Sequence, residues 1–222
     1  KEQLSSFVVH DLKNPVNSMD LHAQLLLRDP GLPERARESV QAIRQEARSL
    51  LRLVLNLLDI SKSEEGQLVP RPIQVDLEAL AADVLEAHQV AAREAGVTLE
   101  RAIEVPALAA DPDLLRRVIE NLLDNAIRHA PERTAVRLTA ARRDGGVEIR
   151  VADEGSGIAP ELREKIFERF VRVESGDRLV TRTGRGLGLA FCKLAVEAHG
   201  GSIRVEDGPP GAVFCVRLPD DR

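Results

Sequence analysis

The chain has 222 residues, of which 43% are hydrophobic, and its formal net charge at pH 7 is −5. This length is enough for one large domain or two small ones. The sequence contains no Trp and no Tyr. With neither a basic field nor a set of stacking rings, direct binding of nucleic acid is not expected.

The first 65 residues have the pattern of two helices. Apolar residues at alternating steps of three and four form a heptad seam in each. The seams are Val9, Leu12, Val16, Met19, Ala23 and Leu26 in the first helix, and Val40, Ile43, Ala47, Leu50, Val54 and Leu57 in the second, which is expected from about residue 33 to 62. Two prolines and a glycine at 28–33 predict a short turn, so the helices are antiparallel neighbours.

Residues 50–58 carry a hydrophobic surface that is wider than one partner helix can bury. This favours a dimeric four-helix bundle built from two copies of the hairpin. The alternative is a hairpin that packs on its own C-terminal domain.

His10 lies off the first seam and shares a face with Asn14 and Asn17, so its imidazole is expected to face water. An exposed histidine is most often a solvated side chain. It becomes a nucleophile when a neighbouring base removes its proton, and Asp11 is the candidate base.

A polar, proline-bearing segment at 61–72 predicts a boundary between two domains, residues 1–65 and 66–222. In the second domain we expect helices at 76–95, from Asp111-Pro112 onward, and at 187–199. Strands are expected at 97–104, 107–110, 135–143, 147–153, 202–206 and 212–218, with an irregular stretch after 153. This order indicates an α/β sandwich with a mixed β-sheet and helices on one face.

Several single residues in the chain receive ordinary structural interpretations. His22 and His88 are expected to face solvent, and His199 to act as a favourable cation at a helix end. Cys192 and Cys215 have no metal-ligand spacing and are too few for a disulfide framework, so we expect small core residues in a cytoplasmic protein.

No apolar run approaches the ~18 residues of a membrane span, and the first residues do not resemble a signal peptide. Residues 1–4 already have the pattern of a helix interior. We therefore expect a fragment that lacks an upstream sensor segment, through which any membrane attachment would occur.

Asn121, Asn125 and Arg128 lie at steps of four and three on one helix face, with His129 beside them. Carboxamide oxygens suit Mg²⁺, and an arginine suits phosphate. The ordinary interpretation is a solvated polar face, and the motif alone does not decide between the two.

Asp153 ends a predicted strand and is followed by glycines at 155 and 157. Such a carboxylate can accept a hydrogen bond from an adenine amino group, and glycines let the backbone approach a flat ring. An ordinary glycine turn is the alternative.

Glycines at 184, 186 and 188 precede the helix that begins near Leu187. Their N–H groups and the positive end of the helix dipole suit phosphate groups. The spacing is neither a dinucleotide-binding fingerprint nor a P-loop.

Taken in order, five segments resemble the H, N, first glycine, F and second glycine boxes of two-component sensor histidine kinases. They are residues 10–15, 121–126, 153–157, 166–170 and 184–188. The resemblance implies a dimeric helical bundle that bears a phosphorylated histidine, joined to an ATP-binding α/β domain of the Bergerat (GHKL) type.

The resemblance also implies roles for particular residues. His10 is the phosphoacceptor, Asp11 assists removal of its proton, and Asn14 orients water in a phosphatase reaction on the partner protein. Asn121 and Asn125 hold Mg²⁺. The implied ATP-binding residues are Asn121, Asn125, Arg128, His129, Asp153, Gly155, Gly157, Ile158, Phe170, Gly184, Arg185, Gly186, Leu187 and Gly188.

Two further features follow from the resemblance. A mobile lid is expected at about 156–183. The pair Arg128-His129 replaces the commoner Lys-Tyr, which leaves the individual duties of these two residues open while the positive charge beside phosphate is retained.

The function implied is autophosphorylation of His10 by ATP in a homodimer, followed by transfer of the phosphoryl group to an aspartate of a response-regulator receiver domain. One alternative is an ATP-hydrolysing clamp or chaperone of the same nucleotide-binding fold, in which a glutamate replaces Asn121 as the base. The other is a catalytically silent dimerisation scaffold.

Overall fold

The computed structural model describes residues 2–64, 66–143, 145–174, 178–181, 186–208 and 210–220. Within these ranges, the side chains of residues 2–13, 45, 64, 172–174 and 178–181 lie outside the description. The chain divides into two compact units, Lys1–Glu65 and Gly66–Arg222.

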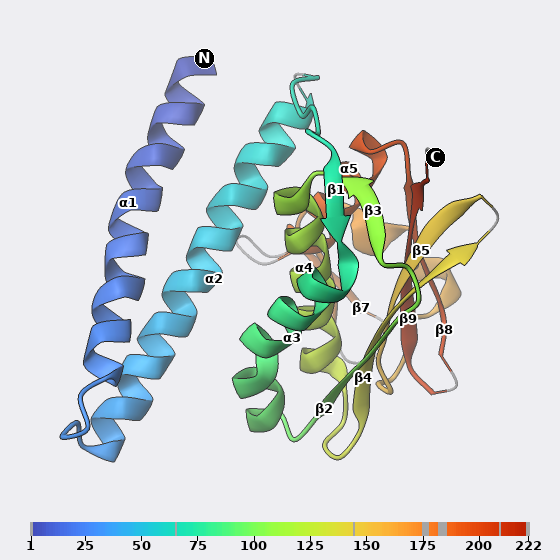
Figure 1. The fold of residues 1–222 in the computed structure, drawn as a ribbon. Coiled ribbons are helices and arrows are strands. Elements are labelled where there is room, and N and C mark those ends of the chain that lie inside the picture. Colours follow the sequence, from blue (N-terminus) through green and yellow to red (C-terminus); the bar gives the residue numbers. More distant parts are fainter. Residues whose placement is uncertain are drawn as a thin grey trace. The chain divides into compact units, whose positions relative to one another are not determined.

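The first unit is a hairpin of two helices, α1 (Glu2–Leu27) and α2 (Glu34–Glu64), as predicted (Figure 1). Arg37 fastens the turn, because its guanidinium donates to the carbonyl oxygens of Leu27 and Asp29, each at 2.9 Å. Farther along the hairpin, Asp20 of α1 accepts from the Nε atoms of Arg44 (3.1 Å) and Arg48 (2.7 Å) of α2. These contacts fix the two helices in register.

The heptad seams of the hairpin are only half covered. Val16, Ala23 and Ala47 are buried. The intervening seam residues are between 49% and 58% exposed; they are Met19, Leu26, Ile43, Leu50 and Leu57. Because large apolar side chains spaced by seven residues seldom stay in water, the hairpin presents an apolar stripe.

The second unit is an α/β sandwich with a mixed sheet, which confirms the predicted fold class. Its elements are β1 (Ile73–Asp76), α3 (Leu77–Glu94), β2 (Thr98–Ile103), β3 (Ala107–Ala110), α4 (Pro112–His129), β4 (Ala135–Arg143), β5 (Gly146–Ala152), η1 (Pro160–Leu162), η2 (Lys165–Phe167), β6 (Val171–Glu174), β7 (Arg178–Thr181), α5 (Gly188–Ala198), β8 (Ser202–Asp207) and β9 (Ala212–Pro219). The main sheet has the order β2-β4-β5-β9-β8. Its β2–β4 pair is parallel, and its other pairs are antiparallel.

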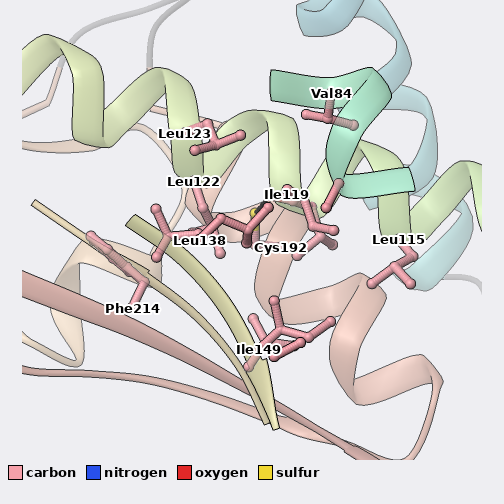
Figure 2. Close-up of a cluster of buried hydrophobic side chains, with 14 of the residues drawn as sticks. Val84, Leu115, Ile119, Leu122, Leu123, Leu138, Ile149, Cys192 and Phe214 are labelled. Carbon is pink, nitrogen blue, oxygen red and sulfur yellow. Dashed lines mark hydrogen bonds between the residues drawn. The ribbon is translucent and has the colours of Figure 1, made fainter. Parts of the chain in front are cut away.

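The hydrophobic core lies between the helices and one face of the main sheet. Leu122 of α4, Leu138 of β4 and Ile149 of β5 point into this space (Figure 2). Successive residues of a strand point to opposite faces, and in β5 the residues next to Ile149 are Glu148 and Arg150, which pair with each other at 3.0 Å. The opposite face of the sheet is therefore charged.

Helix α4 begins as the sequence predicts. Asp111 is its N-cap, with Oδ1 accepting from the N–H groups of Asp113 and Leu114 at 3.1 Å, and Pro112 occupies the first turn. The backbone N–H of Asp111 itself donates to Nε2 of His199 at 2.9 Å, while Nδ1 of His199 lies 2.7 Å from the Ala195 carbonyl oxygen. An accepting Nε2 requires a neutral ring, so the prediction of a cation at His199 is wrong.

Other expectations also differ from the structure. The stretch after Asp153 is less irregular than predicted, since it contains η1, η2 and the antiparallel β6–β7 pair. Strand β1 was not predicted, and it pairs with β3, so β3 lies outside the main sheet.

Among the described helices, none combines the length and apolar character needed to cross a membrane.

His88 is buried, with 6% of its surface exposed, and the prediction that it faces solvent is wrong. Nδ1 lies 2.7 Å from the Val84 carbonyl oxygen and Nε2 lies 3.2 Å from Oδ1 of Asp124. Burial opposes a charge on the ring, but the bond to Asp124, its charge and the Val84 carbonyl outweigh burial and raise the pKa of His88. Below pH 6.5, the ordinary pKa of the group, an imidazolium therefore joins α3 to α4.

Replacing His88 by Leu should remove this cation and lower the free energy of unfolding at pH 6 by about 1–3 kcal/mol, because Asp124 loses its charged partner. The His88 contribution is complete below pH 6.5, the ordinary pKa of the group, and is lost as pH rises through the raised pKa. Urea denaturation followed by circular dichroism should thus show a gap between the wild type and the variant that narrows toward pH 9. A gap that does not change with pH contradicts the charged ring.

Candidate functional site

Asn121 is held so that its carboxamide oxygen faces helix α5. Its Nδ2 donates to the Arg117 carbonyl oxygen at 2.8 Å. A Cβ added at Gly188, the first residue of α5, would lie 2.8 Å from Asn121 Oδ1. Because this distance is shorter than real Cβ contacts, the Asn121 amide would have to move if residue 188 carried a side chain.

Helices α4 and α5 run antiparallel along this contact. The guanidinium carbon of Arg117 lies 4.0 Å from the ring centroid of Phe191, and Sγ of Cys192 lies 3.7 Å from the Val118 carbonyl oxygen. The contact of Asp111 with His199 closes the far end of the pair. Residues later in α5 thus meet residues earlier in α4, and this fixes where the glycine-rich end of α5 lies.

Asp153 is buried at the end of β5, with 4% of its surface exposed. Its Oδ1 accepts from the N–H of Gly155 at 2.8 Å and from that of Ala212 at 3.4 Å, and its own N–H donates to the Ala212 carbonyl oxygen at 3.0 Å. Burial raises the pKa of Asp153, although these two N–H donors act in the opposite direction. The side chain is therefore an oriented hydrogen-bonding group with little access to water.

The loop after Asp153 packs against the end of α4 and against β9. A Cβ at Gly155 would lie 2.6 Å from the His129 carbonyl oxygen. Gly211, with φ +102°, leaves no room either, since a Cβ there would lie 1.9 Å from the Asp153 carbonyl oxygen. Two glycines thus permit the close backbone packing that holds Asp153.

The third motif contacts the predicted F box. Gly186 has φ +122°, and its carbonyl oxygen accepts from the N–H of Phe170 at 3.1 Å. Phe170 has φ 62°, an uncommon value for a bulky residue. Leu187 cannot cap α5 with its side chain, so the first N–H groups of that helix point out of its end.

The structure brings most of the predicted residues together around α4. One group lies where α4 meets the start of α5, and its members are Asn121, Gly186, Leu187, Gly188 and Phe170. The other group lies at the end of α4, and its members are His129, Asp153 and Gly155. Asn125 is partly buried, as are Gly157 and Ile158, whereas Arg128 and His129 are exposed. Gly184 and Arg185 lie outside the described residues, as do the side chains of His10 and Asp11, whose backbone is in α1.

Sequence reasoning missed the part that β9 plays. Gly211 and Ala212 contact Asp153 across 58 and 59 positions of sequence, so no local pattern joins them. A glycine directly before an apolar strand was the available signal.

The arrangement suits a nucleotide with Mg²⁺. Asn121 offers an oxygen beside the open end of a helix, and Asp153 offers a buried carboxylate. Among the described residues, no group of three or more His, Cys, Asp and Glu side chains could hold a metal ion by itself. Phosphate oxygens and water would therefore have to complete a Mg²⁺ site.

Two family matches cover the two ends of the chain and leave residues 67–109 outside both. Residues 110–222 match the family described as histidine kinase-, DNA gyrase B- and HSP90-like ATPase. Residues 1–66 match the family described as His Kinase A (phospho-acceptor) domain. The boundary between the matched regions is compatible with the two compact units.

Individual proteins are similar over most of the chain. Sensor-like histidine kinase SenX3 of Mycobacterium tuberculosis is 35% identical over 218 residues, which is 96% of this chain and 52% of the relative. The chain thus spans about half the length of this curated relative. The crystal structure of full-length ShkA in complex with AMPPNP matches with a TM-score of 0.71 and 31% identity, over 98% of this chain and 46% of that chain. Mycobacterial sensor histidine kinase MprB matches with a TM-score of 0.57 and 32% identity, over 68% of this chain and 98% of that one.

The packing at Gly211 gives a stability test. Gly211→Ala should lower the free energy of unfolding by about 3 kcal/mol or more, because a methyl group must displace the Asp153 backbone and adopt a strained φ. Gly145→Ala is the matched control, since Gly145 also has positive φ but nothing lies within 4 Å of its Cβ position. That control should cost about 1–2 kcal/mol. Equal losses in urea denaturation of the two variants contradict the close contact.

Proposed function

This chain belongs to the sensor histidine kinases of two-component signalling, and from this premise we propose that it phosphorylates its own His10 with ATP and passes the phosphoryl group to an aspartate of a response regulator. Residues 1–65 serve dimerisation and phosphotransfer in this proposal, and residues 66–222 bind ATP. The observation that carries it is the approach of Asn121 Oδ1 to Gly188, which places an amide oxygen beside the end of α5.

The nucleotide would be held at both of its ends. Both hydrogen bonds to the Asp153 carboxylate fall on Oδ1, so Oδ2 is the oxygen offered to the adenine amino group. The N–H groups at Gly186, Leu187 and Gly188 suit the phosphates, together with the charge of Arg128. Asn121 and Asn125 would hold Mg²⁺, which offsets phosphate charge when bound.

The chemistry at His10 is an in-line displacement. A bond forms between a ring nitrogen and the γ-phosphorus, the bond from that phosphorus to the β–γ bridging oxygen breaks, and ADP leaves. Asp11 takes the proton that the ring gives up. In the second step the phosphoryl group moves from the ring nitrogen to a carboxylate oxygen of the response regulator.

A second copy of the chain is proposed to cover the apolar stripe of the hairpin. Met19 and Leu26 on α1, and Ile43, Leu50 and Leu57 on α2, are spaced by seven and half exposed. Two such stripes facing each other form the core of a four-helix bundle. The homodimer is thus supported by side chains that the single hairpin leaves exposed.

The hydrolysing clamps and chaperones are less well supported. Their reaction needs a base where Asn121 stands, and a carboxamide whose Nδ2 donates to the Arg117 carbonyl oxygen cannot accept a proton from water.

Asn14, one turn after His10 and exposed on α1, supports a further proposal that the chain also dephosphorylates its regulator.

Incubation with γ-labelled ATP tests the proposed function. The wild type should acquire acid-labile label, and His10→Gln should acquire none, because glutamine lacks the nucleophilic nitrogen. The matched control is His22→Gln, which changes an exposed histidine on the same helix and should label like the wild type.

The result that contradicts the proposal is label that persists in His10→Gln, or a wild type that hydrolyses ATP without becoming labelled. The second result would favour the clamp class. Loss of label in His22→Gln alone would move the acceptor to that residue.

A further inference from the structure

Arg163 joins two segments that are distant in sequence. It follows η1, and its side chain is 24% exposed. Nε donates to the Ile158 carbonyl oxygen at 3.1 Å. Nη2 donates to the carboxylate of Asp207, the last residue of β8, in a short ion pair. The guanidinium thus uses two of its N–H donors at once, which its planar, forked donor set allows.

Both segments adjoin the loop at residues 153–158, called the Asp153 loop below. Ile158 ends that loop, directly after Gly157, which has φ +72° and would place a Cβ 3.1 Å from the Gly211 carbonyl oxygen. Asp207 leads into the turn toward β9, where Gly208 donates its N–H to the Gly211 carbonyl oxygen at 2.9 Å. Gly211 in turn lies against the Asp153 backbone.

These contacts and the chain between them form a closed ring that begins and ends at Asp153. The chain runs from Asp153 through its loop to Ile158, the Arg163 side chain crosses to Asp207, and the turn through Gly211 returns to Asp153. Removal of the Arg163 guanidinium leaves Asp153 in place, because the hydrogen bonds of Asp153 to Gly155 and Ala212 do not involve that group. It releases the Gly157–Ile158 end of the loop.

We propose that Arg163 is a positioning residue for the adenine side of the nucleotide site, acting through the Ile158 carbonyl and the Asp207 carboxylate. The inference rests on the proposed function, since it assumes that the Asp153 loop receives the base. Its consequence is specific. Arg163 sets how well the nucleotide is held and leaves the transfer of phosphate from bound ATP unchanged.

Calorimetric titration of ADP into the full chain, without Mg²⁺, measures the effect on the base side. Arg163→Met should weaken ADP binding about fivefold to tenfold, as expected for loss of a charged hydrogen bond at a partly exposed site. The KM for ATP in autophosphorylation should rise by the same factor, with kcat unchanged. Arg163→Lys should fall between, because an ammonium reaches one of the two acceptors.

Arg101→Met is the matched control, since Arg101 makes a comparable ion pair with Glu78 at 2.8 Å and contacts neither segment. It should bind ADP like the wild type. Adding Asp207→Ala to Arg163→Met should cause no further loss, because the carboxylate acts through the guanidinium.

Wild-type affinity in both Arg163 variants, with ADP still binding to the wild type, overturns the inference and leaves the proposed function intact. So does a loss confined to kcat. A wild type that binds no ADP overturns the proposed function and this inference with it. If Arg163→Met fails to fold, the intermediate affinity of Arg163→Lys decides the question.

Discussion

The absence of a side chain at Gly188 is the constraint on which the site depends. A Cβ there would lie 2.8 Å from Asn121 Oδ1, so the amide would have to leave its position for the two helices to keep their other contacts. The stacking of Arg117 on Phe191 and the contact of His199 with Asp111 hold α4 and α5 along their lengths. The end of α5 is thereby fixed beside an oriented amide oxygen, where N–H donors and an oxygen acceptor meet.

Helix α4 connects this contact to the other half of the site. One turn of the helix carries Asn121 toward α5, and its last residue, His129, lies against Gly155. The phosphate side and the base side of the proposed nucleotide site therefore share one rigid element. Buried His88 adds a contact from α3 to Asp124, between the two asparagines of the same helix. A site built on one helix keeps the distance between its two ends.

Local signals in the sequence were enough for most of the fold. Asp111 and Pro112 mark the start of α4 because capping depends on neighbouring residues. The position of His88 was also encoded, since it lies four residues after buried Val84 on the apolar face of α3. Its partner Asp124 lies 36 residues away, so the local pattern predicts a solvent-facing side chain where the structure has a buried one.

Contacts between distant segments account for what the sequence did not predict. The position of His199 at a helix end predicts a cation, yet the N–H that makes it an acceptor belongs to Asp111, 88 residues earlier. Gly211 and Arg163 act on the Asp153 loop through packing and hydrogen bonds that only the folded sheet creates. The motifs themselves were recognisable, since each glycine or asparagine stands at a fixed spacing, but their mutual distances required the structure.

Calorimetric titration of Mg²⁺·AMPPNP into Gly188→Ala measures what the contact of Asn121 with Gly188 contributes to nucleotide binding. The wild type should bind one nucleotide per chain. The variant should lose at least about tenfold in affinity, equivalent to ~1.4 kcal/mol, while its circular dichroism spectrum stays that of the folded chain. A folded Gly188→Ala that binds the nucleotide as tightly as the wild type would contradict the assignment of this contact as the centre of the nucleotide site.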